Sequence, residues 1–212
     1  MNLTAKLTCP QVVHINYDSQ YFLASSFMRI QEFYESPFEN IRGKAFTLFD
    51  YMDTEVRNNG KFNYFDKWSG FNFPDYILKQ FLKTQKVLYF NQEALKFVYI
   101  KSLVEWDKPF YVIGTYGKDS KVYDHELAHA FYYLSAEYKF QMDMLIGDIP
   151  PKKHKRILKN LSETGYTEKV FKDEIQAYIS TSPSLYFGDI SKKTENNFRD
   201  IFDSFKYEFT KD

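Results

Sequence analysis

The residues most able to do chemistry in this chain are His125 and His129, two of its four histidines, in the run His-Glu-Leu-Ala-His. On an α-helix, residues four apart lie one above the other on the same face. Two imidazoles placed in this way can bind one metal ion, each at roughly 2.0–2.1 Å. Glu126 would lie beside that ion, where its carboxylate could take a proton from a water molecule on the metal. The run therefore predicts a metal site with its own general base.

A catalytic zinc site takes three protein ligands, so a third must come from elsewhere in the chain. One longer zinc motif places a histidine six residues beyond the second one and a glycine three beyond it, but these positions are Ser135 and Tyr132. His154 lies in the basic run 152–156, whose charges oppose a dication. Glu137 is two turns along the same helix, too far along its axis. None of these positions supplies the ligand.

Glu174 is the best candidate for the third ligand. It lies in a predicted helix whose apolar face includes Phe171, Ile175 and Tyr178, and Ala177 allows close packing. An acidic residue at the inner edge of such a helix has little reason to be there unless a cation faces it. The alternative is that Asp173 and Glu174 are simply a solvent-exposed acidic pair.

The elements that must position these residues follow from periodicity and from turn signals. Helices are expected at 19–34, 74–83, 120–146, 152–163, 168–181 and 191–209. Strands are expected at 11–17, 62–68 (as one arm of a hairpin), 86–90, 96–103 and 110–116. The segment 43–52 fits either a strand or a short helix.

This order of elements predicts an α+β fold with a small mixed sheet and a mainly helical C-terminal half. We expect one domain over residues 1–212, because the length suits a single hydrophobic core. Within it, residues 1–107 would form an α/β N-terminal lobe. Residues 108–212 would form a catalytic lobe with one strand followed by helices.

The flanks of the histidine run carry a resemblance to a known family. Residues 122–131, Val-Tyr-Asp-His-Glu-Leu-Ala-His-Ala-Phe, look like the extended signature of zincin metallopeptidases. With Glu174 on a later helix, the chain resembles the gluzincin branch, whose third ligand is a glutamate on a second helix. The resemblance covers residues 110–181, and the first 105 residues match no family that we can name. Gly165 and Tyr166 ahead of Glu174 are distantly similar to lethal-factor-like peptidases.

The resemblance implies a zincin-like fold and Zn²⁺ held by His125, His129 and Glu174. It implies a peptidase in which Glu126 is the general base for an attacking water and the substrate is a polypeptide. Tyr166 would stabilise the oxyanion, with Tyr178 as its rival. The strand 110–116 would take the place of the zincin edge strand and pair with an extended substrate.

Three polar residues near the proposed ligands could orient the imidazoles: Asp124, Asp173 or Gln176. The sequence does not choose among them. His14 lies alone in the first predicted strand, and we interpret it as a packing or surface residue rather than a ligand.

Composition narrows the function classes. Lys+Arg and Asp+Glu are equal at 28 each, which disfavours general binding to nucleic acid. The single cysteine, Cys9, excludes a disulfide framework and a cysteine-based zinc site. No apolar run is long enough for a signal peptide or a membrane span, so a cytoplasmic location is expected. The alternative function is a non-catalytic binding or regulatory protein with the zincin fold.

Overall fold

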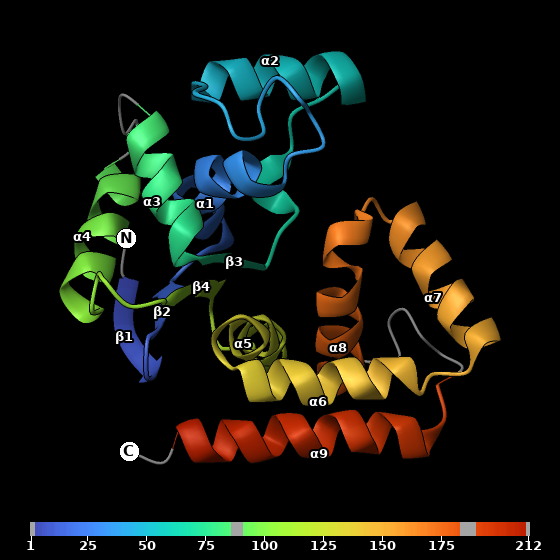
Figure 1. The fold of residues 1–212 in the computed structure, drawn as a ribbon. Coiled ribbons are helices and arrows are strands. Elements are labelled where there is room, and N and C mark those ends of the chain that lie inside the picture. The colour runs from blue at the N-terminus through green and yellow to red at the C-terminus, as the bar shows by residue number, and fades with distance from the viewer. Residues whose placement is uncertain (1–2, 86–90, 183–189, 211–212) are drawn as a thin grey trace. The chain divides into compact units, whose positions relative to one another are not determined.

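The computed structural model describes residues 3–85, 91–182 and 190–210. Across these residues the chain is α+β, as predicted, with a small four-stranded mixed sheet and many helices. The chain folds as two compact units, Met1–Asp119 and Ser120–Asp212. The strands lie in the first unit, and the described part of the second unit is helical (Figure 1).

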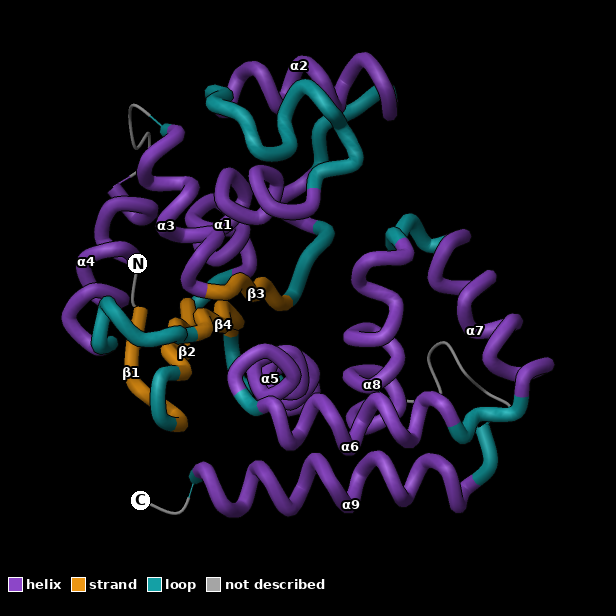
Figure 2. Tube along the Cα trace, in the orientation of Figure 1, coloured by secondary structure: helices purple, strands orange, loops and turns teal. Residues whose placement is uncertain are grey.

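The sheet of the first unit has the strand order β1-β2-β4-β3 (Figure 2). β1 and β2 form an antiparallel hairpin, β2 and β4 are parallel, and β3 is antiparallel to β4. The strands are β1 (Leu3–Cys9), β2 (Val12–Tyr17), β3 (Gly70–Pro74) and β4 (Tyr111–Tyr116). The strands predicted at 11–17 and 110–116 are confirmed, whereas the sequence patterns did not predict β1 or β3.

The prediction that residues 110–116 form an edge strand is wrong. β4 lies between β2 and β3 and forms ladders with both, so neither of its sides is open to an added strand. The unexpected neighbour is β3, whose glycine and proline ends give it little β propensity. Strand addition of a substrate to β4 is therefore excluded.

The first helices of this unit have clear caps. α1 (Gln20–Glu35) begins after Ser19, whose side chain accepts a hydrogen bond from the Phe22 backbone. α2 (Leu48–Asn59) has a capping box between Thr47 and Asp50, so the ambiguous segment 43–52 leads into a helix. α3 (Asp75–Thr84) confirms the helix predicted at 74–83.

Two predicted strands of the first unit are wrong, and a third lies outside the described residues. Residues 62–68 contain the short 3-10 helix η1 (Tyr64–Asp66) in place of a hairpin arm. Residues 96–103 belong to α4 (Asn91–Leu103). Phe97 and Ile100 are buried there while Val98 and Tyr99 are exposed, which is the three-residue spacing of a helix and not strand alternation. The segment predicted at 86–90 lies outside the described residues.

The core of the first unit forms where α1 packs on the sheet. The Phe27 ring lies 5.5 Å from the Phe71 ring and 5.8 Å from the Phe73 ring, between centroids. A Cβ atom added to Gly114 of β4 would lie 2.5 Å from the Phe27 ring. Glycine at this position is what lets the helix approach the middle of the sheet.

The second unit carries the predicted metal ligands. Its helices are α5 (Ser120–Leu134), α6 (Ala136–Gly147), α7 (Pro151–Glu163), the 3-10 turn η2 (Glu168–Val170), α8 (Phe171–Thr181) and α9 (Lys192–Phe209). The helices predicted at 152–163 and 191–209 are confirmed, and that predicted at 168–181 begins as η2 before continuing as α8.

The single helix predicted over 120–146 is wrong, because the chain bends at Ser135. This residue adopts an extended conformation, and its side chain accepts a hydrogen bond from the Tyr138 backbone at 3.1 Å. A serine in this role ends one helix and caps the next. The bend directs α6 back alongside α9 (Figures 1 and 2).

An aromatic cluster on α5, α6 and α9 fixes the helices of the second unit. The Phe131 ring of α5 lies 5.6 Å from that of Tyr138 and 6.0 Å from that of Phe202, between centroids. Phe205 packs on Tyr138 from α9 at 5.0 Å. This packing holds α5 with its histidines directed toward α8.

No helix in the described part of the chain is long and apolar enough to cross a membrane.

Candidate metal centre

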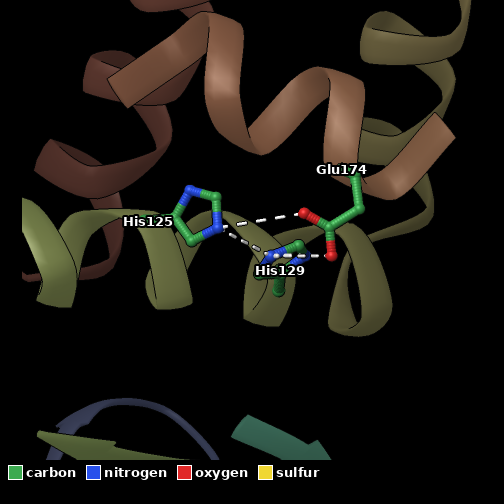
Figure 3. A group of neighbouring side chains, drawn as sticks. All are labelled: His125, His129 and Glu174. Carbon is green, nitrogen blue, oxygen red and sulfur yellow. Dashed lines mark hydrogen bonds and ion pairs between the residues drawn. The ribbon is translucent and has the colours of Figure 1, made fainter. Parts of the chain in front are cut away.

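Two neighbouring helices of the second unit bring the predicted ligands together. His125 and His129 project from successive turns of α5 toward Glu174 on α8 (Figure 3). One ligand atom from each residue lies within 4.8 Å of the other two. Among the residues described, these form the one group of three or more His, Cys, Asp or Glu side chains with such spacing.

The separation between the two histidine nitrogens matches that of a small tetrahedral ion, and the Glu174 oxygens lie farther from both histidines. With bonds of about 2.0–2.1 Å, the ligand atoms of a tetrahedral zinc site lie about 3.3 Å apart. His125 Nε2 and His129 Nε2 are 3.3 Å apart. Glu174 places Oε2 4.0 Å from His125 Nε2 and Oε1 3.9 Å from His129 Nε2. Two imidazoles and one carboxylate are a donor set that catalytic zinc sites use, so these residues fit the metal.

Small and polar residues let α5 and α8 approach each other closely. Ala128 on α5 and Ala177 on α8 are fully buried. Gln176 on α8 donates a hydrogen bond to the Ala128 backbone oxygen at 3.2 Å. The position of Glu174 relative to the histidines therefore depends on direct packing of the two helices.

His129 is held by an acidic neighbour. Its Nδ1 lies 2.8 Å from Asp173 Oδ1, which directs Nε2 toward the other two ligands. Burial disfavours the charged form of His129, but the carboxylates of Asp173, Glu174 and Glu126 outweigh it and raise the pKa of His129 to about 10. The neighbouring carboxylates therefore favour a positive charge at this position.

His125 has a less polar environment. Its Nδ1 lies 3.5 Å from Thr181 Oγ1, and its ring packs on Tyr178 with 4.5 Å between centroids. Burial, together with the charge of His129, lowers the pKa of His125 well below the ordinary value. His125 therefore keeps the neutral form that metal ligation requires.

Glu126, the predicted general base, lies on α5 between the two histidines. Its side chain is buried, with 7% of its surface exposed. Its charge contributes to the field that raises the pKa of His129, so the carboxylate belongs to the same electrostatic environment as the ligands. A buried carboxylate beside the cluster can exchange a proton with a group bound there.

The two candidate tyrosines form a pair. The hydroxyls of Tyr166 and Tyr178 are 2.9 Å apart. Tyr178 contacts the His125 ring, and Tyr166 joins the cluster through Tyr178. The geometry thus brings together both residues that the sequence offered for the oxyanion.

The three residues proposed to orient the imidazoles differ in their contacts. Asp173 contacts His129 directly, and Gln176 donates to Asp173 at 2.9 Å. Asp124 instead pairs with Lys206 of α9 at 2.6 Å. His14, in the first unit, lies 2.8 Å from Thr115 Oγ1 across two strands, in keeping with a packing role.

Sequence reasoning did not identify Thr181 or Tyr138. Thr181 had a signal, because Glu174, Tyr178 and Thr181 follow the i, i+4, i+7 spacing of one face of α8. Tyr138 donates to Gln176 from α6, and a link between residues 38 apart leaves no local pattern.

No protein-family model, curated protein or solved structure gave a significant match to the chain. A functional assignment therefore depends on the chain's own residues and their geometry. In this chain those residues are the cluster of α5 and α8.

Proposed function

We propose that this chain is a zinc-dependent metallopeptidase of the gluzincin type that hydrolyses peptide bonds in a polypeptide. The observation that carries the proposal is the convergence of His125, His129 and Glu174, with the buried Glu126 one residue from the first ligand. The zincin-like fold belongs to the proposal as well. It is supported by a ligand helix that follows a strand of a small mixed sheet and by a glutamate on a second helix.

Each residue has a distinct role in the proposed reaction. When bound, zinc would supply Lewis-acid polarisation and lower the pKa of its water to about 7. Glu126 accepts a proton from the attacking water and delivers it to the leaving amine. Asp173 keeps His129 in one orientation throughout. A hydroxyl of the pair Tyr166 and Tyr178 donates to the oxyanion that develops on the scissile carbonyl.

A non-catalytic zincin-fold binding protein is the alternative. Such a scaffold would need His125, His129 and Glu174 to hold a metal, but it would not need an acid beside them. The carboxylate of Glu126 favours the enzyme, because it is buried and its charge acts on His129, which places it where a general base would be needed.

The test of the peptidase compares wild type with Glu126→Gln. Metal analysis should find about one zinc per chain in both proteins. Cleavage of a denatured polypeptide, followed by mass spectrometry, should occur with wild type and be lost in the variant. If the wild-type protein binds no zinc after zinc is added, the proposal is wrong. If Glu126→Gln cleaves as fast as wild type, another group is the base.

The ligand set is tested with Glu174→Ala. Because a ligand that binds only the folded state stabilises it, zinc should raise the midpoint of thermal unfolding of wild type. The variant should show little of this rise. Glu137→Ala, which removes an exposed carboxylate from α6, is the control and should respond as wild type does. An unchanged response in Glu174→Ala would mean that a different residue is the third ligand.

A further inference from the structure

Gln176 is a glutamine with no exposed surface in the interior of the second unit. Its amide makes hydrogen bonds to three helices. Oε1 accepts from the Tyr138 hydroxyl of α6 at 2.9 Å. Nε2 donates to the Ala128 backbone oxygen of α5 at 3.2 Å and to Asp173 Oδ1 of α8 at 2.9 Å. Both hydrogens of the amide nitrogen are therefore used.

The orientation of this amide is determined by its partners. A backbone carbonyl and a carboxylate can only accept hydrogen bonds, so Nε2 must face Ala128 and Asp173. Oε1 must then face Tyr138, whose hydroxyl can donate. A flipped amide would place Oε1 against two acceptors, and one orientation is strongly preferred as a result.

The chain of hydrogen bonds ends on a proposed metal ligand. Asp173 Oδ1 accepts from Gln176 and also contacts His129 Nδ1 at 2.8 Å. Ala128, the other acceptor of Gln176, immediately precedes His129. One buried amide thus fixes both the carboxylate that orients His129 and the backbone next to it.

We infer that Gln176 is a positioning residue of the metal centre, which holds Asp173 against His129 Nδ1 so that Nε2 of His129 faces the metal. This inference deepens the proposed function and rests on it. Tyr138 completes the arrangement by fixing the other end of the amide. Gln176 itself contacts neither the metal nor the substrate.

Packing alone does not explain a glutamine at this position. Gln176 is fully buried, and fully buried helix positions are usually apolar, as its sequence neighbours Ile175, Ala177 and Ile179 are. Burying an amide is costly unless every polar atom finds a partner, and a fully satisfied network orders its members. The partners of Gln176 lead to a ligand, which is why we assign it a role in the site.

The test replaces Gln176 with methionine, which has a similar shape and no donor. Because Gln176→Met alone leaves the buried Tyr138 hydroxyl without its acceptor, the double variant Gln176→Met/Tyr138→Phe is made in parallel. Zinc affinity, measured by competition with a chelator on the full chain, should fall about tenfold or more in both. Gln141→Met is the matched control, because Gln141 donates to Glu137 on α6 at 3.2 Å, and it should bind zinc as wild type does.

A second measurement needs no metal. In metal-free wild type, the Nδ1 hydrogen of His129 should appear in the nitrogen-edited NMR spectrum and exchange slowly with water, because Asp173 accepts it. The hydrogen should exchange rapidly in the double variant and stay protected in Gln141→Met. The midpoint of thermal unfolding reports whether each variant is folded.

The two measurements separate the inference from the proposed function. A protected hydrogen that depends on Gln176, in a protein that binds no zinc, supports the positioning role and overturns the zinc enzyme. Zinc affinity and exchange that are both unchanged in the folded double variant would overturn the role of Gln176 and leave the peptidase standing.

Discussion

His129 Nδ1 and Asp173 Oδ1 lie 2.8 Å apart and join α5 to α8 beside the proposed metal. The contact gives His129 a fixed ring orientation, with Nε2 directed at Glu174 and His125. A carboxylate behind a ligating histidine also makes it a better donor to the metal. The two helices therefore contribute a proposed ligand and the group that orients it.

Replacing Asp173 with asparagine should weaken zinc binding about tenfold, because the amide oxygen can still accept a hydrogen bond but the charge is lost. Asp173→Ala should have the larger effect. Asp124→Asn is the control, since Asp124 also neighbours a ligand in sequence but pairs with Lys206. Chelator competition measures all three. Equal losses of zinc affinity in Asp124→Asn and Asp173→Asn would contradict the assignment of Asp173 as the group that orients His129.

The site shows which parts of a candidate metal centre can be predicted from sequence. His125, Glu126 and His129 are set by helical spacing alone, so the local pattern was sufficient. Glu174 was inferred from its place on an amphipathic helix, and the structure brings it to the histidines. The choice of Asp173 over Asp124 depends on which helix faces each carboxylate, and no local pattern contains that information.

In the fold, too, features set by local sequence could be predicted and features set by tertiary contacts could not. α1 was predicted because its cap and its periodicity lie within the segment. α4 was misread because a run of aromatic and β-branched residues favours strands, while tertiary packing buries Phe97 and Ile100 on one helical face. β3 is too short to give a pattern, and its pairing with β4 closed the edge that the sequence left open for a substrate.

The tyrosine pair should affect turnover without affecting zinc. Two hydroxyls hold two hydrogens, and the bond between Tyr166 and Tyr178 uses one of them. The tyrosine that accepts within the pair can direct its own hydrogen at the oxyanion. Its replacement by phenylalanine should lower kcat about 10²- to 10³-fold, and replacement of the other tyrosine should cost less.

Peptide cleavage and zinc content of Tyr166→Phe and Tyr178→Phe decide between the two. Tyr207→Phe, which changes an exposed tyrosine on α9, is the control. If both single variants cleave as fast as wild type, the oxyanion has a different donor. Loss of zinc from either variant would show that the pair supports the ligands instead.

The first unit contains a buried ion pair whose loss should be costly. Arg29 Nη1 lies 2.9 Å from Glu93 Oε2, and both side chains are almost fully buried. Glu93→Ala would leave the Arg29 charge buried without this partner, so we expect a loss of about 3–5 kcal/mol in the free energy of unfolding. Asp53→Ala breaks the exposed pair with Arg57 and should cost less than about 1 kcal/mol.

Urea unfolding followed by tryptophan fluorescence measures this difference. Both tryptophans of the chain, Trp68 and Trp106, lie in the first unit and report its unfolding. Similar losses in the free energy of unfolding for Glu93→Ala and Asp53→Ala would show that burial does not determine how much the ion pair of Arg29 and Glu93 contributes to stability.

Glu32 gives the first unit a stability that depends on pH. Burial raises the pKa of Glu32 from 4.5 to about 7; hydrogen bonds with Ser36, Tyr64 and Tyr51 lower it in part, and Glu55 raises it further. Folding therefore favours the protonated acid. The stabilising contribution is fully present below pH 4.5 and is lost as the pH rises to about 7.

Glu32→Gln should remove this dependence, because the amide is neutral at every pH. Relative to wild type, the variant should gain up to about 3 kcal/mol in the free energy of unfolding between pH 4.5 and pH 7, since each pKa unit corresponds to about 1.4 kcal/mol. Above pH 7 the gain should stay constant. Urea unfolding by tryptophan fluorescence at several pH values measures the difference, with Glu39→Gln as an exposed control. A difference between Glu32→Gln and wild type that is the same at pH 4.5 and pH 7 would show that folding does not raise the pKa of Glu32.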